Sequence, residues 1–215
     1  MNLELEPLDL YDYRCRVQDQ YRARNDSLAA GSDPAAVCSR FRQAKDHLFA
    51  NHHQSALDPD QRRGFSGLAY FPYDPVAAID ATIEPRVNLK PMLVETGTGE
   101  TVRLVNAATV EFEFSGNAAT LTLYWIEVYG GGLFLPFWDP TSPDESYGGG
   151  RYLIDTVKGA DFAWIDEDRT RIRLDFNYAY NPSCSYNPRW SCPLAPPENR
   201  LDFPVRAGER KYQAV

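Results

Sequence analysis

The amino-acid sequence predicts a mostly β fold: an antiparallel β-barrel or sandwich preceded by two N-terminal α-helices. Apolar residues recur at helical spacing up to about residue 52 and alternate with polar residues from about residue 65 onward. Short alternating runs joined by glycine turns are typical of antiparallel sheets. The chain has 215 residues, of which 43% are hydrophobic, so it can bury a core of its own. We therefore expect a helical segment, 1–64, packed on a β-barrel-like domain, 65–215, as one folding unit.

Two helices are predicted before residue 57. The first ends before Gly31, and glycine is a typical C-terminal stop. Asp33 and Pro34 suit the N-cap and first position of the second helix, which we expect to end near His52, ahead of the turn-like residues 57–60. The apolar stripes are Leu10, Tyr13, Val17, Tyr21 and Leu28 in the first helix and Val37, Phe41, Ala44 and Leu48 in the second. We expect residues 1–30 to lie away from any active site and to offer their stripe to a partner or a homodimer contact.

The β part is predicted from alternating runs that are rich in β-branched and aromatic residues. The expected strands are 68–71, 76–84, 89–95, 102–105, 110–114, 121–125, 133–137, 152–156, 172–176 and 201–205. The residues 96–99 and 115–117 have the composition of hairpin turns. The second turn lies between strictly alternating runs, so it marks the clearest hairpin in the sequence.

Composition and charge exclude several classes of partner. The formal net charge is −8, which disfavours nucleic acids and anionic membrane surfaces as partners. No apolar run approaches the roughly 20 residues that span a bilayer. The first ten residues lack the basic start of a secretory signal. We therefore expect a cytoplasmic protein whose four cysteines are reduced thiols.

The segment 147–152 is the first candidate ligand site. Its three successive glycines, 148–150, permit backbone N–H groups to converge on an anion, and the fork of Arg151 fits a carboxylate or phosphate. Alternatively, the glycines form a packed turn and Arg151 pairs with Asp139 or Asp175. Phosphate-loop and dinucleotide-binding motifs do not occur in the sequence.

A second candidate lies at the end of a predicted strand. Residues two apart on a strand point to the same face, so Asp175 and Asn177 could converge with Tyr180 on one pocket. Asp and Asn at a strand end more commonly cap the following turn, and this is the competing interpretation.

The segment 181–199 is a loop with five prolines that also contains Cys184 and Cys192. Proline excludes regular structure here, so the loop must be held by packing against the barrel. We expect the two thiols to lie close together and to act structurally, with a disulfide forming on oxidation. A metal site lacks paired cysteine spacing and nearby histidines, and a reactive thiolate needs a cation such as Arg151 or Arg189.

Several long motifs resemble a known prokaryotic family. They are Phe137–Ser142, Tyr147–Tyr152, Asp175–Pro182, Cys184, Cys192–Leu194 and Glu198–Asn199, and upstream Lys45–Asp46, Phe49, Phe65–Leu68 and Asp74–Pro75. On these residues, about 40–211 of the chain resembles the family named domain of unknown function 1684. That family has no assigned activity, so the resemblance implies no catalytic residues.

We therefore predict a β domain that binds a small molecule, with anionic ligands as one candidate class, and that could be an enzyme. The alternative is a structural or protein-interaction module without catalytic activity, in which the same residues form a buried polar network. The predicted ligand-binding residues are Tyr147, Gly149, Arg151, Tyr152, Asp175, Asn177, Tyr180, Asn181, Cys184 and Cys192. The sequence predicts no metal ligands and identifies no cofactor.

Overall fold

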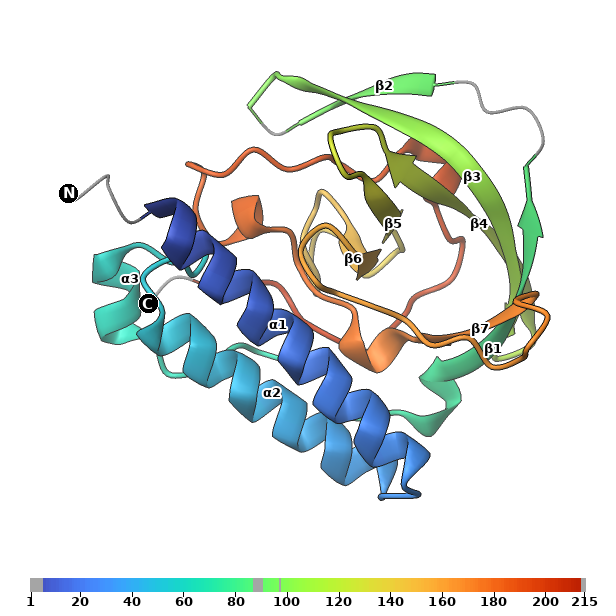
Figure 1. Cartoon of the computed structure of the whole chain (residues 1–215), viewed down its shortest axis with the longest axis horizontal. Coiled ribbons are helices and arrows are strands. Elements are labelled where there is room, and N and C mark those ends of the chain that lie inside the picture. Colours follow the sequence, from blue (N-terminus) through green and yellow to red (C-terminus); the bar gives the residue numbers. More distant parts are fainter. Residues whose placement is uncertain (1–5, 87–90, 97, 214–215) are drawn as a thin grey trace.

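The computed structural model describes residues 6–86, 91–96 and 98–213 and contains two long helices followed by one antiparallel sheet (Figure 1). The helices are α1 (Glu6–Ala29), α2 (Pro34–Asn51) and the short α3 (Pro59–Gly64). The strands are β1 (Ala78–Pro85), β2 (Pro91–Glu95), β3 (Thr101–Phe114), β4 (Asn117–Ile126), β5 (Gly132–Phe137), β6 (Arg151–Asp155) and β7 (Arg171–Asp175). Short 3₁₀ turns are η1 (Pro75–Ala77), η2 (Phe176–Tyr178), η3 (Ser183–Ser185) and η4 (Pro197–Asn199). The predicted fold class, mostly β with two N-terminal helices, is confirmed.

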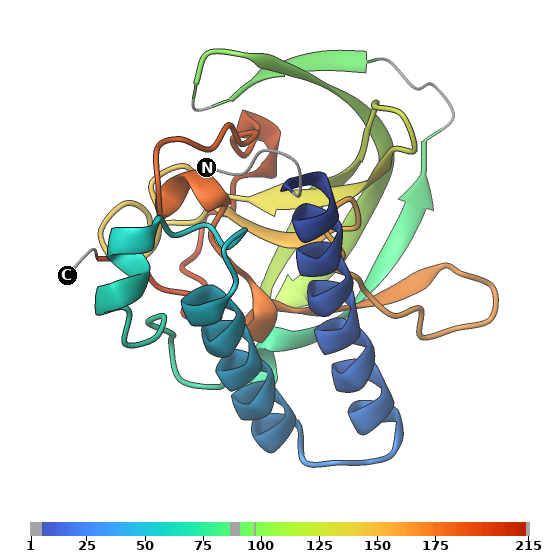
Figure 2. The ribbon, with the colours of Figure 1, turned by 60° about the vertical axis from the view of Figure 1, so that its left-hand side comes forward.

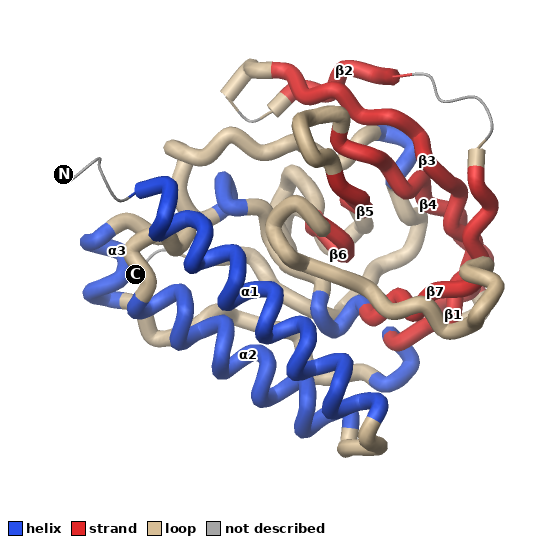
Figure 3. The backbone as a smooth tube through the Cα atoms, viewed as in Figure 1, coloured by secondary structure: helices blue, strands red, loops and turns tan. Residues whose placement is uncertain are grey.

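The sheet is curled into a half-barrel. Its strand order is β6-β5-β4-β3-β1-β7, and β2 pairs with β3 outside this path. All of these pairs are antiparallel. Within the described part of the chain, the edge strands β6 and β7 do not pair with each other, so the barrel stays open. Figure 3 shows that irregular segments of the chain lie inside the curl.

The main apolar core joins the sheet to these irregular segments. Phe176, in η2, is fully buried, and its ring centroid lies 5.2 Å from that of Phe137 on β5. Phe114 on β3 stacks on Phe203 of the C-terminal segment, with 5.5 Å between centroids. Such aromatic pairs contribute beyond their buried area. The C-terminal segment is therefore part of the core.

Local sequence signals account for the ends of the two long helices. Asp33 caps α2, because its Oδ2 accepts a hydrogen bond of 2.9 Å from the backbone N–H of Ala36, and Pro34 occupies the first helical position. Past the end of α1, Gly31 has φ +77°, the left-handed conformation that glycine adopts without strain. None of the described helices is long and apolar enough to cross a membrane.

The residues expected to form a turn at 57–60 instead begin α3. Asp58 and Gln61 form a capping box: Asp58 Oδ1 accepts the Gln61 N–H, and Gln61 Oε1 accepts the Asp58 N–H, each at 2.8 Å. Pro59 follows the cap as the first helical residue. The pattern of Asp58 followed three residues later by Gln61 predicts this helix start, so the signal was present in the sequence.

Two predicted strands are wrong. The segment 68–71 makes a single bridge, between Tyr70 and Glu209, because the N–H of Leu68 donates to the side chain of Asp46 instead of to a strand. The segment 201–205 contains Pro204, which has no N–H, and the Val205 N–H donates to a buried carboxylate. Both segments are therefore irregular chain.

Two other predicted strands, 102–105 and 110–114, join into the single long strand β3. The register with β4 shifts between Asn106 and Ala108, a β-bulge that bends the strand without ending it. The predicted hairpins are present between β2 and β3 and between β3 and β4. Residues 1–5, 87–90, 97 and 214–215 lie outside the described residues, and they include the start of the predicted strand 89–95 and one glycine of the first turn.

The apolar stripe of α1 faces the protein interior. Tyr21 is 4% exposed, and its ring lies edge-on to Phe41 of α2, with 4.9 Å between centroids. Figure 2 shows the two helices side by side against one side of the half-barrel. On the outer face of α1, Leu8 and Tyr11 remain exposed. The stripe that suggested a homodimer contact is thus largely used within the chain.

Candidate functional site

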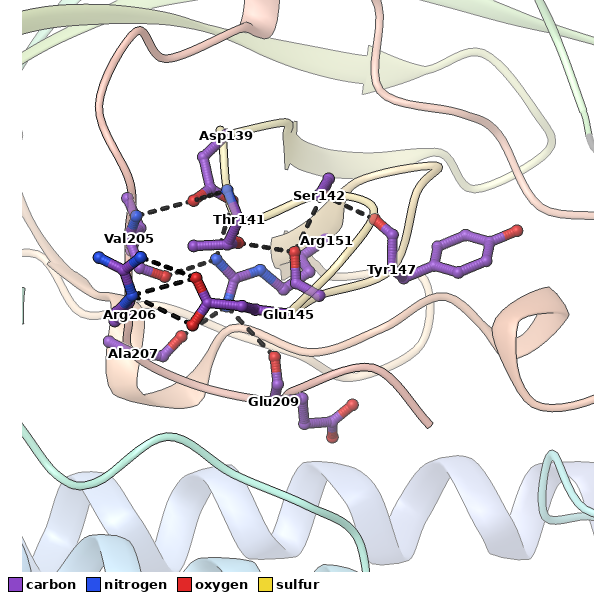
Figure 4. A network of polar contacts seen from close by, with 11 residues as sticks. Asp139, Thr141, Ser142, Glu145, Tyr147, Arg151, Val205, Arg206, Ala207 and Glu209 are labelled. Carbon is purple, nitrogen blue, oxygen red and sulfur yellow. Dashed lines mark hydrogen bonds and ion pairs between the residues drawn. The ribbon is translucent and has the colours of Figure 1, made fainter. Parts of the chain in front are cut away.

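Arg151 is buried at the start of β6 and pairs with Asp139 (Figure 4). Its Nη2 lies 2.9 Å from Asp139 Oδ1 and 2.8 Å from the carbonyl oxygen of Val205. Its Nη1 donates to the carbonyl oxygens of Ala207, at 2.6 Å, and Glu209, at 3.3 Å. Pairing with Asp139, the alternative role considered for Arg151, is thus the arrangement in the structure, and an anion could reach Nη1 or Nη2 only by displacing these acceptors.

The same network joins the loop after β5 to the C-terminal segment. Asp139 Oδ2 accepts the Val205 N–H at 2.7 Å, and Asp139 Oδ1 accepts the hydroxyl of Thr141 at 3.0 Å. The hydroxyl of Thr141 also contacts that of Ser146 at 2.7 Å. Burial lowers the pKa of Arg151, whereas Asp139 opposes this shift. Among the described residues, Arg151 Nε has no hydrogen-bond partner, whereas both terminal nitrogens are occupied. Such a network fits a structural role better than an open binding site.

The glycines before Arg151 form a packed turn. The Gly150 N–H donates to the carbonyl of Tyr147 at 3.0 Å, and Gly150 has φ +87°. A Cβ on Gly149 would lie 2.6 Å from the ring of Tyr147 and 3.0 Å from Leu194. Small size is therefore required at Gly149 because two side chains pack directly against its backbone.

Asp175 and Asn177 act as caps. The Asp175 carboxylate accepts both the N–H and the side-chain amide of Asn177, at 3.0 and 2.9 Å. The Asn177 side chain in turn exchanges two hydrogen bonds with the backbone of Asp74, at 2.7 and 2.9 Å. Burial raises the pKa of Asp175. These contacts connect the end of β7 to the residue that precedes η1 and β1. Asp175 thus caps the turn that follows its strand, as the competing interpretation expected.

A cavity of about 70 Å³ lies between the helix pair and the half-barrel. It is lined from α1 by Tyr13, Val17, Gln20 and Tyr21, from α2 by Phe41, Lys45, Leu48 and Phe49, and from the half-barrel side by Lys158, Ala160, Tyr180, Asn181, Ser183 and Tyr186. Two predicted ligand residues, Tyr180 and Asn181, therefore belong to its wall. The helix α1, expected to lie away from any site, forms another part of that wall.

Two buried polar atoms on this wall have no hydrogen-bond partner among the described residues: Tyr180 Oη and Asn181 Oδ1. The orientation of the Asn181 amide is set by its other atom, because Nδ2 donates to the carbonyl of Arg210 at 2.8 Å. Burial raises the pKa of Tyr180 well above its ordinary value, so its hydroxyl stays protonated. The wall therefore presents one unused donor and one unused acceptor.

Glu209 connects this wall to the helices. Its carboxylate is 1% exposed, and Oε1 lies 2.5 Å from Lys45 Nζ on α2. Its Oε2 accepts the Asn181 N–H at 2.9 Å and the hydroxyl of Tyr186. Lys45 Nζ also lies 4.6 Å from the ring centroid of Tyr180. Sequence reasoning missed Glu209 and the pairing of Lys45, because no local motif joins residues so far apart in the chain.

The remaining predicted residues cluster beside Cys184 and Cys192. The Cys184 N–H lies 3.4 Å from Cys192 Sγ, and the Tyr147 hydroxyl lies 3.7 Å from Cys184 Sγ. Tyr152 is fully buried, donates its hydroxyl to the carbonyl of Pro193, and exchanges backbone hydrogen bonds with Tyr180. Across residues 6–86, 91–96 and 98–213, no group of three or more His, Cys, Asp or Glu side chains is arranged to hold a metal ion.

A comparison with protein-family models identifies the family of this chain. The family model described as "Protein of unknown function (DUF1684)" matches residues 63–210. The solution NMR structure of the uncharacterised protein from gene locus rrnAC0354 of Haloarcula marismortui is similar at 35% sequence identity, with a TM-score of 0.56. That similarity covers 80% of this chain and 91% of the other. No curated protein matches the sequence. The matched residues span most of the sheet, the Arg151 network and the cysteine loop, and the chain therefore belongs to the DUF1684 family.

Proposed function

We propose that the protein binds a small carboxylic acid bearing a hydroxyl or amino group, in the cavity between α1, α2 and the half-barrel. The observation that carries this proposal is the pair of unused polar atoms on the cavity wall, Tyr180 Oη and Asn181 Oδ1. A buried donor or acceptor without a partner costs about 1–3 kcal/mol. A ligand that accepts from Tyr180 and donates to Asn181 removes both costs.

The charges around the cavity favour a carboxylate. Lys45 and Lys158 both line it, and Lys45 is the more enclosed, with a side chain that is 14% exposed. Glu209 offsets the charge of Lys45, so the site suits a ligand with an acidic group and a hydrogen-bond donor rather than a multiply charged anion.

The size of the cavity limits the ligand. A volume of about 70 Å³ is less than half that of the engineered apolar cavity of about 150 Å³ that holds benzene. It accommodates only a molecule of a few non-hydrogen atoms unless α1 shifts outward. This restricts the proposal to acids with short carbon chains.

A scaffold without a ligand is the second candidate. The network around Arg151 supports it, because Asp139 and backbone carbonyls already occupy the terminal nitrogens of this predicted ligand residue. In a scaffold, ordered water would satisfy Tyr180 Oη and Asn181 Oδ1. The two candidates differ in what the Tyr180 hydroxyl does: in a binding protein its loss weakens binding of an acid, and in a scaffold no acid depends on it.

Binding should be tested by thermal-shift and calorimetric titration of wild type, Tyr180→Phe and Tyr70→Phe with a panel of short hydroxy and amino acids. Tyr70 is the matched control, since its buried hydroxyl also has no partner among the described residues and lies outside the cavity lining. We expect an acid that stabilises wild type and Tyr70→Phe but binds Tyr180→Phe about tenfold or more weakly, as for a lost hydrogen bond to a charged group. Absence of stabilisation by any acid, or equal binding to both variants, supports the scaffold.

A further inference from the structure

Cys184 and Cys192 are held in contact by the fold. The backbone N–H of Cys184 donates to Cys192 Sγ at 3.4 Å. Both are free thiols in the structure. The chain between them turns back through hydrogen bonds from the N–H groups of Tyr186 and Asn187 to the carbonyl of Ser183, at 3.1 and 3.3 Å. The nearness of the two residues therefore does not depend on a disulfide bond between them.

Contacts on both sides of Cys192 hold this end of the loop in place. The indole N–H of Trp190 donates to the carbonyl of Ala56 at 2.9 Å. Pro193 forms a bridge with Thr96 and accepts the buried hydroxyl of Tyr152 through its carbonyl. Because these contacts lie outside the pair itself, the backbone needs little rearrangement when the pair changes its bonding.

The two sulfurs differ in access and in environment. Cys192 is 1% exposed, whereas Cys184 is half-buried and lies beside the Tyr147 hydroxyl. The hydrogen bond from the Cys184 thiol lowers the pKa of Cys192 to about 6, and Lys158 and the N–H groups of Cys184 and Ser183 act in the same direction. Cys192 is therefore the more acidic of the two thiols, and Cys184 is the more accessible.

We propose that Cys184 and Cys192 are a reversible dithiol–disulfide site that exchanges with low-molecular-weight disulfides such as glutathione disulfide. Accessibility assigns the roles: Cys184 meets the incoming disulfide and Cys192 resolves the mixed disulfide. Neither cysteine lines the proposed acid-binding cavity, so this proposal does not rest on a ligand bound there.

The exchange balances in two steps. Cys184 passes its proton to Cys192 Sγ, attacks one sulfur of the incoming disulfide and displaces the other as a thiolate, which leaves a mixed disulfide on Cys184. Cys192 then loses its proton to this thiolate and attacks Cys184 Sγ, and the second thiolate departs and takes a proton from water. The net change oxidises two protein thiols to one disulfide and reduces one small disulfide to two thiol equivalents.

The full-length reduced protein should be incubated with glutathione disulfide, quenched with acid and analysed by intact mass and peptide mapping. We expect wild type to lose the mass of two hydrogen atoms, with a Cys184–Cys192 link and no lasting glutathione adduct. Cys192→Ser should accumulate one glutathione on Cys184, because the resolving sulfur is gone. Cys15→Ser is the control, since Cys15 lies on α1 away from the pair, and it should behave as wild type.

Two outcomes would overturn the proposal. One is a wild type in which Cys184 and Cys192 stay reduced while Cys15 is modified. The other is a stable glutathione adduct on wild-type Cys184, which would show that Cys192 does not resolve it. If Cys192→Ser does not fold, the wild-type products still decide, because linked, singly modified and unmodified peptides have different masses.

Discussion

Arg151 is the largest side chain that the structure buries completely. Removing a guanidinium and a carboxylate from water costs several kcal/mol per ion, and their attraction offsets this only when hydrogen bonds satisfy the remaining positions. Here Asp139 and backbone carbonyls occupy both terminal nitrogens of Arg151. The pair therefore holds two distant segments together, and loss of one partner leaves a buried charge alone.

We expect Arg151→Met to lower the free energy of unfolding by about 3–5 kcal/mol, because Asp139 is left as an unpaired buried carboxylate. Urea denaturation followed by circular dichroism measures this. Arg206→Met is the control: its pair with Glu145 is exposed, and the Arg206 side chain is 60% accessible, so its loss should destabilise the protein far less than the loss of Arg151. Equal losses in the two variants would contradict a structural role for the buried pair.

At the scale of elements, α1 is fixed to the rest of the protein by close packing. A Cβ on Gly159, in the loop after β6, would lie 3.2 Å from the backbone nitrogen of Gln18 on α1. Arg24 of α1 lies 4.7 Å from the ring centroid of Tyr178. Tyr21 is buried between the helices, as described above. These contacts make α1 a cover of the half-barrel.

We expect Tyr21→Ala to destabilise the protein by about 3 kcal/mol or more, as for other large buried aromatics. Tyr11→Ala is the matched control on the same helix, because Tyr11 is 69% exposed and its loss should change the free energy of unfolding by less than about 0.5 kcal/mol. Thermal or urea unfolding of both variants checks the difference. Similar stability of Tyr21→Ala and wild type would show that α1 is only loosely attached.

For the whole molecule, buried carboxylates set part of the pH dependence of stability. Asp155 is 3% exposed, and burial raises its pKa, an effect that Lys158 only partly offsets. A raised folded-state pKa means that the folded protein binds this proton more tightly than the unfolded chain. The contribution of Asp155 to stability therefore falls as pH rises from about 4, the unfolded value, through its folded-state pKa.

Asp155→Asn should therefore be more stable than wild type at neutral pH, and the difference should shrink as the pH falls toward about 4. Asp166→Asn is the control of opposite sign. Hydrogen bonds from Thr170, and then from the Arg171 backbone, lower the pKa of Asp166, so its loss should destabilise the protein at neutral pH and matter less in acid. Thermal melts between about pH 2.5 and 7 measure both, because the contribution of Asp166 is lost only as the pH falls below about 4, through its lowered folded-state pKa. The same pH trend in both variants would contradict these assignments.

The sequence by itself determined the elements whose causes are local. The apolar stripes and end signals of α1 and α2 depend on residues within a few positions of one another, so these helices could be predicted. The alternation of apolar and polar residues in β3 and β4 is equally local, so the β3–β4 hairpin could be predicted too. The capping of η2 by Asp175 and the nearness of Cys184 to Cys192 are local in the same sense.

Only the tertiary structure decided the partners that come from far along the chain. The Val205 N–H is drawn to Asp139, which keeps 201–205 out of the sheet and gives Arg151 its carboxylate. The pairing of Lys45 with Glu209, and the enclosure of Tyr180 Oη beneath α1 and α2, follow from how the helices pack on the half-barrel. No sequence periodicity predicts such contacts. Each joins residues far apart in the chain, which meet only because the elements between them fold and pack.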